Sequence, residues 1–252
     1  MKSVTGTTIP SFSFAKMNEQ IYGDYHYNQG IEIDPAKTGL VVVDMQPAFF
    51  DTCFGQAKSN AKLMPGGLDY FGQRVKELVI PRHQQLLNYF RSHGMLVVYI
   101  VTWSESETLA DMMPQQKRNI RRWEQTISEQ CYRKWNPGMA VADQIAPLGH
   151  EMIVPKTTGS AFISSMLPTI LHNAGVNTVV LTGINTNGCV FETAVAGKNM
   201  GFDFVLVSDA TACYHPLLQE EAEVWMARHF ALIRTTDQTM RMLDEAKEKS
   251  RP

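Results

Sequence analysis

Short runs of apolar residues alternate with longer amphipathic segments along the chain from residue 38 onward. The apolar runs predict six strands, at 39–44, 95–102, 151–155, 177–183, 203–208 and 230–234. The intervening segments predict helices near 69–93, 162–174, 189–201, 217–228 and 237–248. Continuous apolar strands separated by helices indicate a parallel sheet that is covered on both faces. With right-handed crossovers, the pattern predicts a doubly wound, three-layer α/β/α fold with a six-stranded, mostly parallel sheet.

Glycines support these boundaries. Gly94, Gly175 and Gly201 each follow a predicted helix and precede a predicted strand. This is the position after a helix where a positive φ is favoured, and glycine adopts it without steric cost.

Two segments do not follow this alternation. Residues 1–34 are polar and carry scattered aromatics (Phe12, Phe14, Tyr22, Tyr25 and Tyr27), which we interpret as an extended arm that lies on the domain or on a neighbouring subunit. Residues 35–252 then form one α/β domain, a size that a single core can support. The second irregular segment, 103–150, is long enough to form a lid or a substrate-specific insertion.

The composition excludes several classes of protein. The net charge is −2 and no long basic run occurs, so neither a nucleic-acid nor a membrane surface is expected. No secretory signal and no apolar stretch of membrane-spanning length is visible. The four cysteines show no metal-type spacing, which indicates reduced thiols and a cytoplasmic location.

Cys189 occupies the most informative position in the chain. The segment Gly183-Ile-Asn-Thr-Asn-Gly-Cys189 joins a predicted strand to a predicted helix, which places Cys189 at or beside a helix N-terminus. We expect this position to lower the pKa of the thiol and to offer free backbone N–H groups to an anion. Cys189 is therefore a candidate nucleophile.

Two charged residues are predicted to lie at the same edge of the sheet. Asp44 ends the apolar run Val41-Val42-Val43, and Lys156 ends the run Met152–Pro155. The carboxyl ends of parallel strands meet at one edge, where such sheets bind ligands. Asp44, Lys156 and Cys189 are thus expected to converge.

These segments resemble the isochorismatase-like cysteine hydrolases. The matching pieces are Val43-Asp44-Met45-Gln46 with Phe50, Lys156 with Ser160-Ala161-Phe162, Gly183 with Thr186 and Cys189-Val190, and Val207–Ala212. The resemblance extends over roughly residues 35 to 240 and includes nicotinamidases, N-carbamoylsarcosine amidohydrolase, ureidoacrylate hydrolases and isochorismatases.

The resemblance implies a mechanism. Cys189 would attack a carbonyl carbon and form a thioester, Asp44 would act as base, and Lys156 would stabilise charge on both. A cis peptide bond between Ile184 and Asn185 is implied, which would place the Asn185 N–H beside that of Cys189 as an oxyanion hole. Asn185 departs from the alanine that is common in the family.

A few residues distinguish the branches of the family. Isochorismatases lack the cysteine, so Cys189 argues against that branch. Nicotinamidases hold a metal with two histidines shortly after the first Asp, whereas residues 48–82 contain no His. His83 follows within a predicted helix, where a solvated or capping role is expected. We therefore expect no metal and no cofactor, and an amidohydrolase that cleaves a carbamoyl, ureido or small amide C–N bond.

Candidate substrate-binding residues come from several segments. Gln46 could bond to Asp44 or to the substrate, and an apolar pocket wall could include Phe50, Trp103, Trp123 and Phe162, although each of these aromatics could equally be a core residue. Arg118, Arg121 and Arg122 either form a solvated helix face or supply a guanidinium to an anionic substrate.

A nicotinamidase-like or isochorismatase-type hydrolase is the alternative within the family, and other kinds of function also stay open. The chain could be a non-catalytic binding or scaffold member of the family, or a thiol-redox protein if Cys213 reached Cys189. The aromatic arm predicts a homo-oligomer, and the family resemblance suggests a tetramer.

Overall fold

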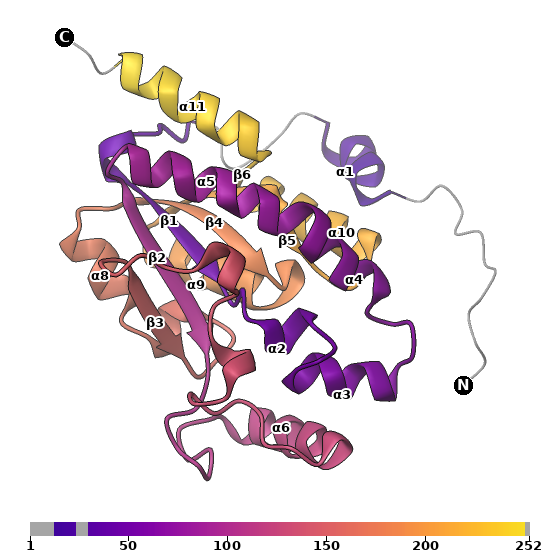
Figure 1. Ribbon diagram of the computed structural model, residues 1–252. Helices are drawn as coiled ribbons and strands as arrows, with labels where there is room; N and C mark the ends of the chain where they lie inside the picture. The colour runs from indigo at the N-terminus through magenta and orange to yellow at the C-terminus, as the bar shows by residue number, and fades with distance from the viewer. Residues whose placement is uncertain (1–12, 24–29, 250–252) are drawn as a thin grey trace.

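The computed structural model describes residues 13–23 and 30–249, and these contain one six-stranded sheet (Figure 1). All neighbouring strands are parallel, in the order β3-β2-β1-β4-β5-β6. The strands are β1 Thr38–Val43, β2 Leu96–Thr102, β3 Met152–Lys156, β4 Thr178–Ile184, β5 Asp203–Ala212 and β6 Ala231–Arg234. The predicted α/β class and the all-parallel sheet are confirmed.

The helices that connect the strands also agree with the hydrophobic pattern. They are α4 Asp69–Arg74, continued by Val75–Val79 into α5 Ile80–Ser92, then α7 Ala161–Ser164, α8 Leu167–Asn173, α9 Phe191–Asn199, α10 Pro216–His229 and α11 Thr236–Lys249. Gly94, Gly175 and Gly201 have φ values of +63°, +69° and +89°, as expected for residues that end helices.

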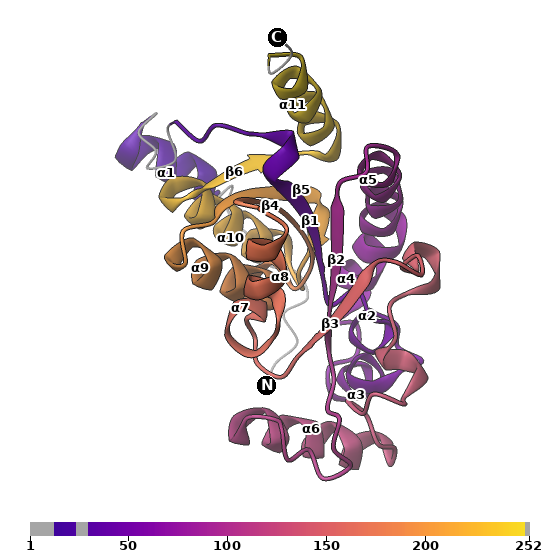
Figure 2. The same cartoon turned by 90° about the vertical axis from the view of Figure 1, so that its left-hand side faces the viewer.

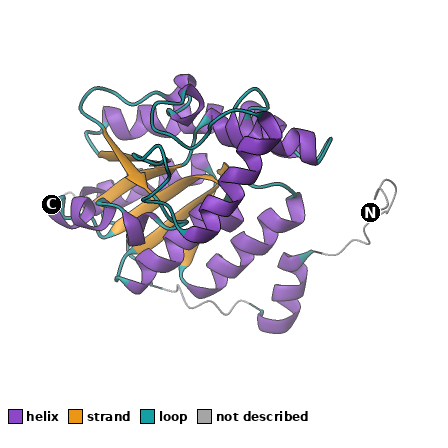
Figure 3. Ribbon diagram, turned by 90° about the horizontal axis from the view of Figure 1, so that it is seen from below, coloured by secondary structure: helices purple, strands orange, loops and turns teal. Residues whose placement is uncertain are grey.

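Two apolar cores lie on opposite faces of the sheet, because side chains along each strand alternate between the faces. Leu40 and Val42 of β1 face the core formed with α4, α5 and α11. Val41 and Val43 of the same strand face the core formed with α7, α8, α9 and α10. The two helical layers are visible on either side of the strands in Figure 2 and from below in Figure 3.

The sheet order places a ligand-binding crevice beside β1. From β1 the chain continues outward to β2 and β3 on one side, and it then returns to β4 on the other side. A crevice outside the carboxyl ends of the strands forms where the order reverses, here between β1 and β4. These strands approach closely: a Cβ on Gly183, which has φ +110°, would lie 2.0 Å from the Val43 carbonyl oxygen.

Several helices lie in segments where the hydrophobic pattern predicted none. Residues 103–150 include α6 Pro114–Ile127, and α2 Pro47–Phe50 and α3 Gly55–Leu63 follow β1. Helix α6 lies beyond the carboxyl ends of β1 and β2, apart from the sheet, and packs against α3 (Figure 2). Only Ile120 and Ile127 of this helix are buried.

The predicted extended arm contains a helix, α1 Phe14–Tyr22, which packs on α10 of the same chain. Ser13 Oγ donates a 2.5 Å hydrogen bond to Glu220, and the Arg228 guanidinium lies over the Tyr22 ring. Phe12, Tyr25 and Tyr27 lie outside the described residues. In the part of the chain that is described, no helix is long and apolar enough to cross a membrane.

His83 corrects another expectation, because it is neither solvated nor a cap. It is fully buried in α5, where Nδ1 bonds to the Val79 carbonyl at 2.8 Å and Nε2 has no partner. Burial lowers the pKa of His83 to about 4, against the opposing effects of the Val79 carbonyl and Asp209.

Candidate active site

Four adjacent strands deliver polar side chains to the crevice beside β1. Asp44 directly follows β1, Thr102 ends β2 and Lys156 ends β3. Cys189 follows β4 within the tight turn Thr186–Val190, immediately before α9. The sheet register thus brings together side chains that are up to 145 positions apart in the sequence.

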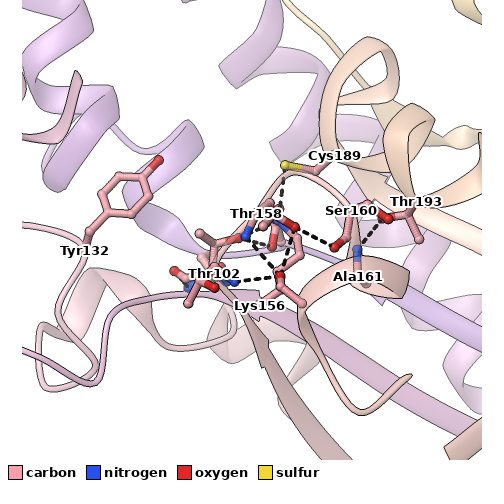
Figure 4. A network of polar contacts seen from close by, with 12 residues as sticks. Thr102, Tyr132, Lys156, Thr158, Ser160, Ala161, Cys189 and Thr193 are labelled. Carbon is pink, nitrogen blue, oxygen red and sulfur yellow. Dashed lines mark hydrogen bonds and ion pairs between the residues drawn. The ribbon is translucent and has the colours of Figure 1, made fainter. Parts of the chain in front are cut away.

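Lys156 is the centre of this group (Figure 4). Its Nζ lies 2.9 Å from Asp44 Oδ2, 3.3 Å from Cys189 Sγ and 2.6 Å from Thr102 Oγ1. It also donates to the Thr158 carbonyl oxygen at 3.1 Å. Because Lys156 is fully buried, these acceptors replace the water that the ammonium would otherwise bind.

Asp44 is held rigidly by its surroundings. Its φ of +52° is in the left-handed region, which is uncommon for a residue other than glycine. Thr102 Oγ1 donates to Asp44 Oδ1 at 2.9 Å. Strained backbone that is stabilised by neighbouring contacts is often found at functional sites.

Burial and the neighbouring charges shift the pKa values of Cys189 and Lys156. Burial raises the pKa of the Cys189 thiol to about 12, Lys156 opposes this rise, and the negative charge of Asp44 adds to it. Burial alone would lower the pKa of Lys156, but the charges of Asp44 and Cys189 raise it above its ordinary value. The expectation of a lowered thiol pKa is therefore wrong for this structure, because desolvation and Asp44 outweigh Lys156.

Cys189 opens into a cavity of about 340 Å³. One wall is aromatic: the Trp123 and Tyr132 rings stack at 5.6 Å, and Phe49 meets Tyr132 edge-on at 5.6 Å. Such a volume suits a small molecule, and the flat rings suit its apolar or planar part.

The turn after β4 forms another part of the cavity. The Ile184–Asn185 peptide bond is cis, at the bond where the family resemblance implies one. Asn185 lines the cavity, and its side chain hydrogen-bonds to the Tyr214 hydroxyl.

Several expected substrate contacts are located elsewhere. Gln46 is fully buried and bonds to backbone, with Oε1 accepting from Thr102 N at 2.7 Å and Nε2 donating to the Met139 carbonyl at 2.5 Å. Phe50 and Phe162 are core residues on opposite faces of the sheet. Trp103 packs at the edge of the core and donates to Glu105 at 2.9 Å. None of the four lines the cavity, so their assignment to substrate binding is corrected to packing and positioning.

The arginine cluster is also absent from the cavity lining. Gln115, Gln116, Asn119 and Trp123 of α6 line the cavity, which makes this side of the helix its wall. Arg118, Arg121 and Arg122 do not line the cavity, and all three are exposed. The structure thus favours the solvated-face interpretation of these arginines.

The sequence interpretation missed Thr102, Phe49 and Tyr132. Thr102 ends a predicted strand, so the convergence of strand ends could have identified it. Phe49 is adjacent to Phe50, and only the turn of α2 decides which ring faces the cavity. Tyr132 lies in the irregular segment and has φ +63°, which no pattern in the sequence indicates.

Two further observations concern metals and thiols. Among residues 13–23 and 30–249 there is no group of three or more His, Cys, Asp or Glu side chains that could hold a metal ion. Cys53, Cys131, Cys189 and Cys213 are all unpaired.

Comparison with known proteins agrees with this geometry. Residues 38–238 match the isochorismatase domain, which covers the whole sheet and the elements of the site. The chain belongs to the isochorismatase family. It is therefore an isochorismatase-family hydrolase, and the resemblance noted from its motifs is confirmed.

Two relatives in the isochorismatase family have moderate sequence identity to this chain. The uncharacterized isochorismatase family protein YrdC of Bacillus subtilis is 29% identical over 178 residues, which cover 71% of this chain and 75% of YrdC. Ureidoacrylate amidohydrolase RutB of Stutzerimonas stutzeri is 27% identical over 211 residues, which cover 77% of each protein.

Solved structures of isochorismatase-like proteins have the same fold. A cysteine hydrolase from Pseudomonas syringae superposes with a TM-score of 0.70 at 23% identity, covering 86% of this chain and 96% of that one. N-carbamoylsarcosine amidase from Thermoplasma acidophilum gives a TM-score of 0.58 at 23% identity, covering 80% and 97%.

Proposed function

We propose that this isochorismatase-family hydrolase is a cysteine-dependent amidohydrolase, which cleaves a C–N bond of a small carbamoyl, ureido or amide substrate. The observation that carries the proposal is the contact of Lys156 Nζ with both Asp44, at 2.9 Å, and Cys189 Sγ, at 3.3 Å, at the base of a cavity. A thiol, a carboxylate and a cation in contact are the groups that acyl transfer through a thioester requires.

Asp44 is the base that activates Cys189. With a pKa of about 12, the resting thiol is protonated at neutral pH, so it needs a proton acceptor. The Asp44 carboxylate and the Cys189 sulfur both contact Lys156 Nζ, so the acceptor lies beside the thiol. Lys156 stabilises the thiolate as the proton moves to Asp44, so the charge of the group changes little during the transfer.

The reaction then proceeds in two halves. The Cys189 sulfur attacks the carbonyl carbon, and the resulting oxyanion accepts hydrogen bonds from the backbone N–H groups of Asn185 and Cys189. The tetrahedral species collapses to a thioester as Asp44 passes its proton to the leaving nitrogen, which departs as ammonia or an amine. Asp44 next takes a proton from water, the hydroxide attacks the thioester, and the carboxylic or carbamic acid leaves with the thiol restored.

The comparisons support C–N bond cleavage among the reactions of the family. RutB carries the name ureidoacrylate amidohydrolase, and it is 27% identical over 77% of each chain. Cys189 also distinguishes the proposed reaction from the vinyl-ether cleavage that isochorismatases catalyse. The family resemblance implies that isochorismatases lack this cysteine.

Substitution of the thiol tests the proposal. Ammonia release from a panel of carbamoyl, ureido and simple amides identifies a substrate, and Cys189→Ser and Cys189→Ala should then reduce kcat by about 10³-fold or more. Cys53→Ser, which changes an exposed thiol, is the matched control and should keep full activity. Activity retained in Cys189→Ala, or failure of iodoacetamide to label Cys189 at all, would contradict the mechanism and favour a non-catalytic binding member of the family.

A further inference from the structure

The charges around the cavity do not match those of a site for an anion. Among the described residues that line it, the carboxylates are Asp44 and Glu192, and none is Arg, Lys or His. Lys156 lies beneath this lining and is paired with Asp44 at 2.9 Å, so these two charges offset each other. The negative charge of the Glu192 carboxylate is not offset in this way, and it gives the cavity a negative potential.

Glu192 lines the cavity and is exposed, whereas Cys189 is partly buried, so Glu192 lies at the cavity mouth. It follows Cys189 by three residues at the start of α9, a spacing that keeps both on one side of the helical turn. Its carboxylate lies directly over Gly159, where any Cβ would overlap it. Among the described residues, Glu192 has no hydrogen bond and no ion pair, so its charge is available to a ligand.

Two buried oxygen atoms in the cavity lining also have no partner. They are Gln116 Oε1 on α6 and Asn185 Oδ1 in the turn after β4. Burying an acceptor without a hydrogen-bond donor costs about 1–3 kcal/mol of stability. A ligand that donates hydrogen bonds to these two atoms would remove that cost. Both atoms need a donor, and a carboxylate has none to offer.

We propose, building on the amidohydrolase function above, that the cavity selects substrates whose remote end is a cationic N–H donor, such as an ammonium group, and disfavours substrates that end in a carboxylate. Glu192 binds the charge, and Gln116 and Asn185 accept hydrogen bonds from N–H groups between it and the scissile amide. Glu192 is the specificity-determining residue.

Three amides of similar size test this selectivity: β-alaninamide, which is cationic at pH 7, butyramide, which is neutral, and succinamate, which is anionic. We expect kcat/KM for ammonia release to be about 10-fold higher for β-alaninamide than for succinamate, from a single charge at the cavity mouth. Glu192→Gln should reduce this ratio to about 3-fold or less. Glu248→Gln, which removes an exposed carboxylate from distant α11, is the control for net charge and should leave the ratio unchanged.

A second readout does not need turnover. Methanethiosulfonate reagents form a mixed disulfide with Cys189 and release methanesulfinate. Reagents that end in a trimethylammonium, a methyl or a sulfonate group are cationic, neutral and anionic, respectively. The cationic reagent should modify Cys189 about 10-fold faster than the anionic one, relative to their rates with free cysteine, and Glu192→Gln should remove most of that preference.

The outcomes separate the two proposals. If none of the amides in the trio or the wider panel is hydrolysed, the amidohydrolase function fails, while the reagent rates still test the charge preference. If succinamate or the anionic reagent reacts as fast as its cationic counterpart, or if Glu192→Gln leaves the ratios unchanged, the proposed selectivity is overturned.

Discussion

Lys156 is the residue on which the chemistry of the site depends most. It is fully buried, and its positive charge beside Cys189 is the main influence that opposes the rise of the thiol pKa. Lysine suits this position because a compact ammonium can direct its donors to several acceptors at once.

Substitution of this lysine tests its effect on the thiol. Lys156→Met removes the cation 3.3 Å from Cys189 Sγ, so the thiol pKa should rise further. At pH 8 the thiolate fraction, and with it the rate of alkylation by iodoacetamide, should fall by about 10-fold for each unit of that rise. The measurement is the pH profile of alkylation, with the exposed Lys76→Met as control and circular dichroism to verify folding. An unshifted profile would contradict the role of Lys156.

His83 predicts a specific loss of stability in acid. Its pKa is about 4 in the folded protein and near 6.5 when unfolded, so below pH 6.5 the unfolded chain binds a proton that the folded protein does not. The stability that neutral His83 contributes is therefore complete above pH 6.5 and is lost as the pH falls towards 4. The loss between pH 7.5 and pH 5 should be about 2 kcal/mol.

Urea unfolding at the two pH values measures this effect. The decrease in the free energy of unfolding should be smaller by that amount in His83→Gln than in the unaltered protein, whatever the variant's stability at pH 7.5. Equal decreases in the two proteins would show that His83 does not govern the acid response.

Among the secondary-structure elements, the contact between β1 and β4 positions the nucleophile relative to the base. Gly183 of β4 lies opposite Val43, the residue before Asp44, and it leads into the turn that carries Cys189. The close approach at Gly183 leaves no room for a side chain between the two strands.

A methyl group at this position should disrupt the structure. Gly183→Ala combines a φ of +110° with a Cβ 2.0 Å from a backbone oxygen, so we expect a loss of about 3 kcal/mol or more in the free energy of unfolding. Gly94→Ala is the matched control: its φ is +63° and its Cβ would meet no atom within 4 Å, so a loss of about 1–2 kcal/mol is expected. Similar losses in denaturant unfolding would contradict the argument from close approach.

Helix α6 provides a second prediction at the scale of an element, because only one of its faces meets the cavity. Single Ala substitutions of Arg118, Arg121 and Arg122 should leave kcat/KM within about 2-fold of the parent, since exposed side chains outside the cavity make no contact with substrate. Asn119→Ala, on the face that lines the cavity, should lower kcat/KM. A large loss in any arginine variant would restore the interpretation that this residue binds an anionic substrate.

At the scale of the whole molecule, apolar side chains remain exposed on separate parts of the surface. Ile21 on α1 is 60% exposed, Ile163 within α7 is 65% exposed, and Met166 just after α7 is 61% exposed. We propose that this chain assembles into a homo-oligomer, with a tetramer expected from the family resemblance, and these side chains are candidates for its interfaces.

Light scattering measures the assembly directly. The mass should be a multiple of 28.4 kDa, and Ile21→Glu should lower it if α1 contributes to the interface. A mass near 28.4 kDa for the unaltered protein at all concentrations would defeat the prediction.

The sequence by itself determined the fold class and the three central residues of the site. Continuous apolar strands and glycine-ended helices specify a parallel α/β sheet, because both signals arise from local backbone geometry and burial. Asp44, Lys156 and Cys189 were identifiable because each follows an apolar strand, and the carboxyl ends of parallel strands converge at one edge.

Only the tertiary structure decided which other side chains reach the cavity. Phe49 rather than Phe50, and Asn119 rather than Arg118, line it because the rotation of α2 and of α6 about their axes determines which residues are presented. The titration of Cys189 was decided in the same way: a helix N-terminus favours a thiolate, but burial beside Asp44 outweighs it. Orientation and desolvation depend on contacts between distant segments, and no local pattern in the chain encodes them.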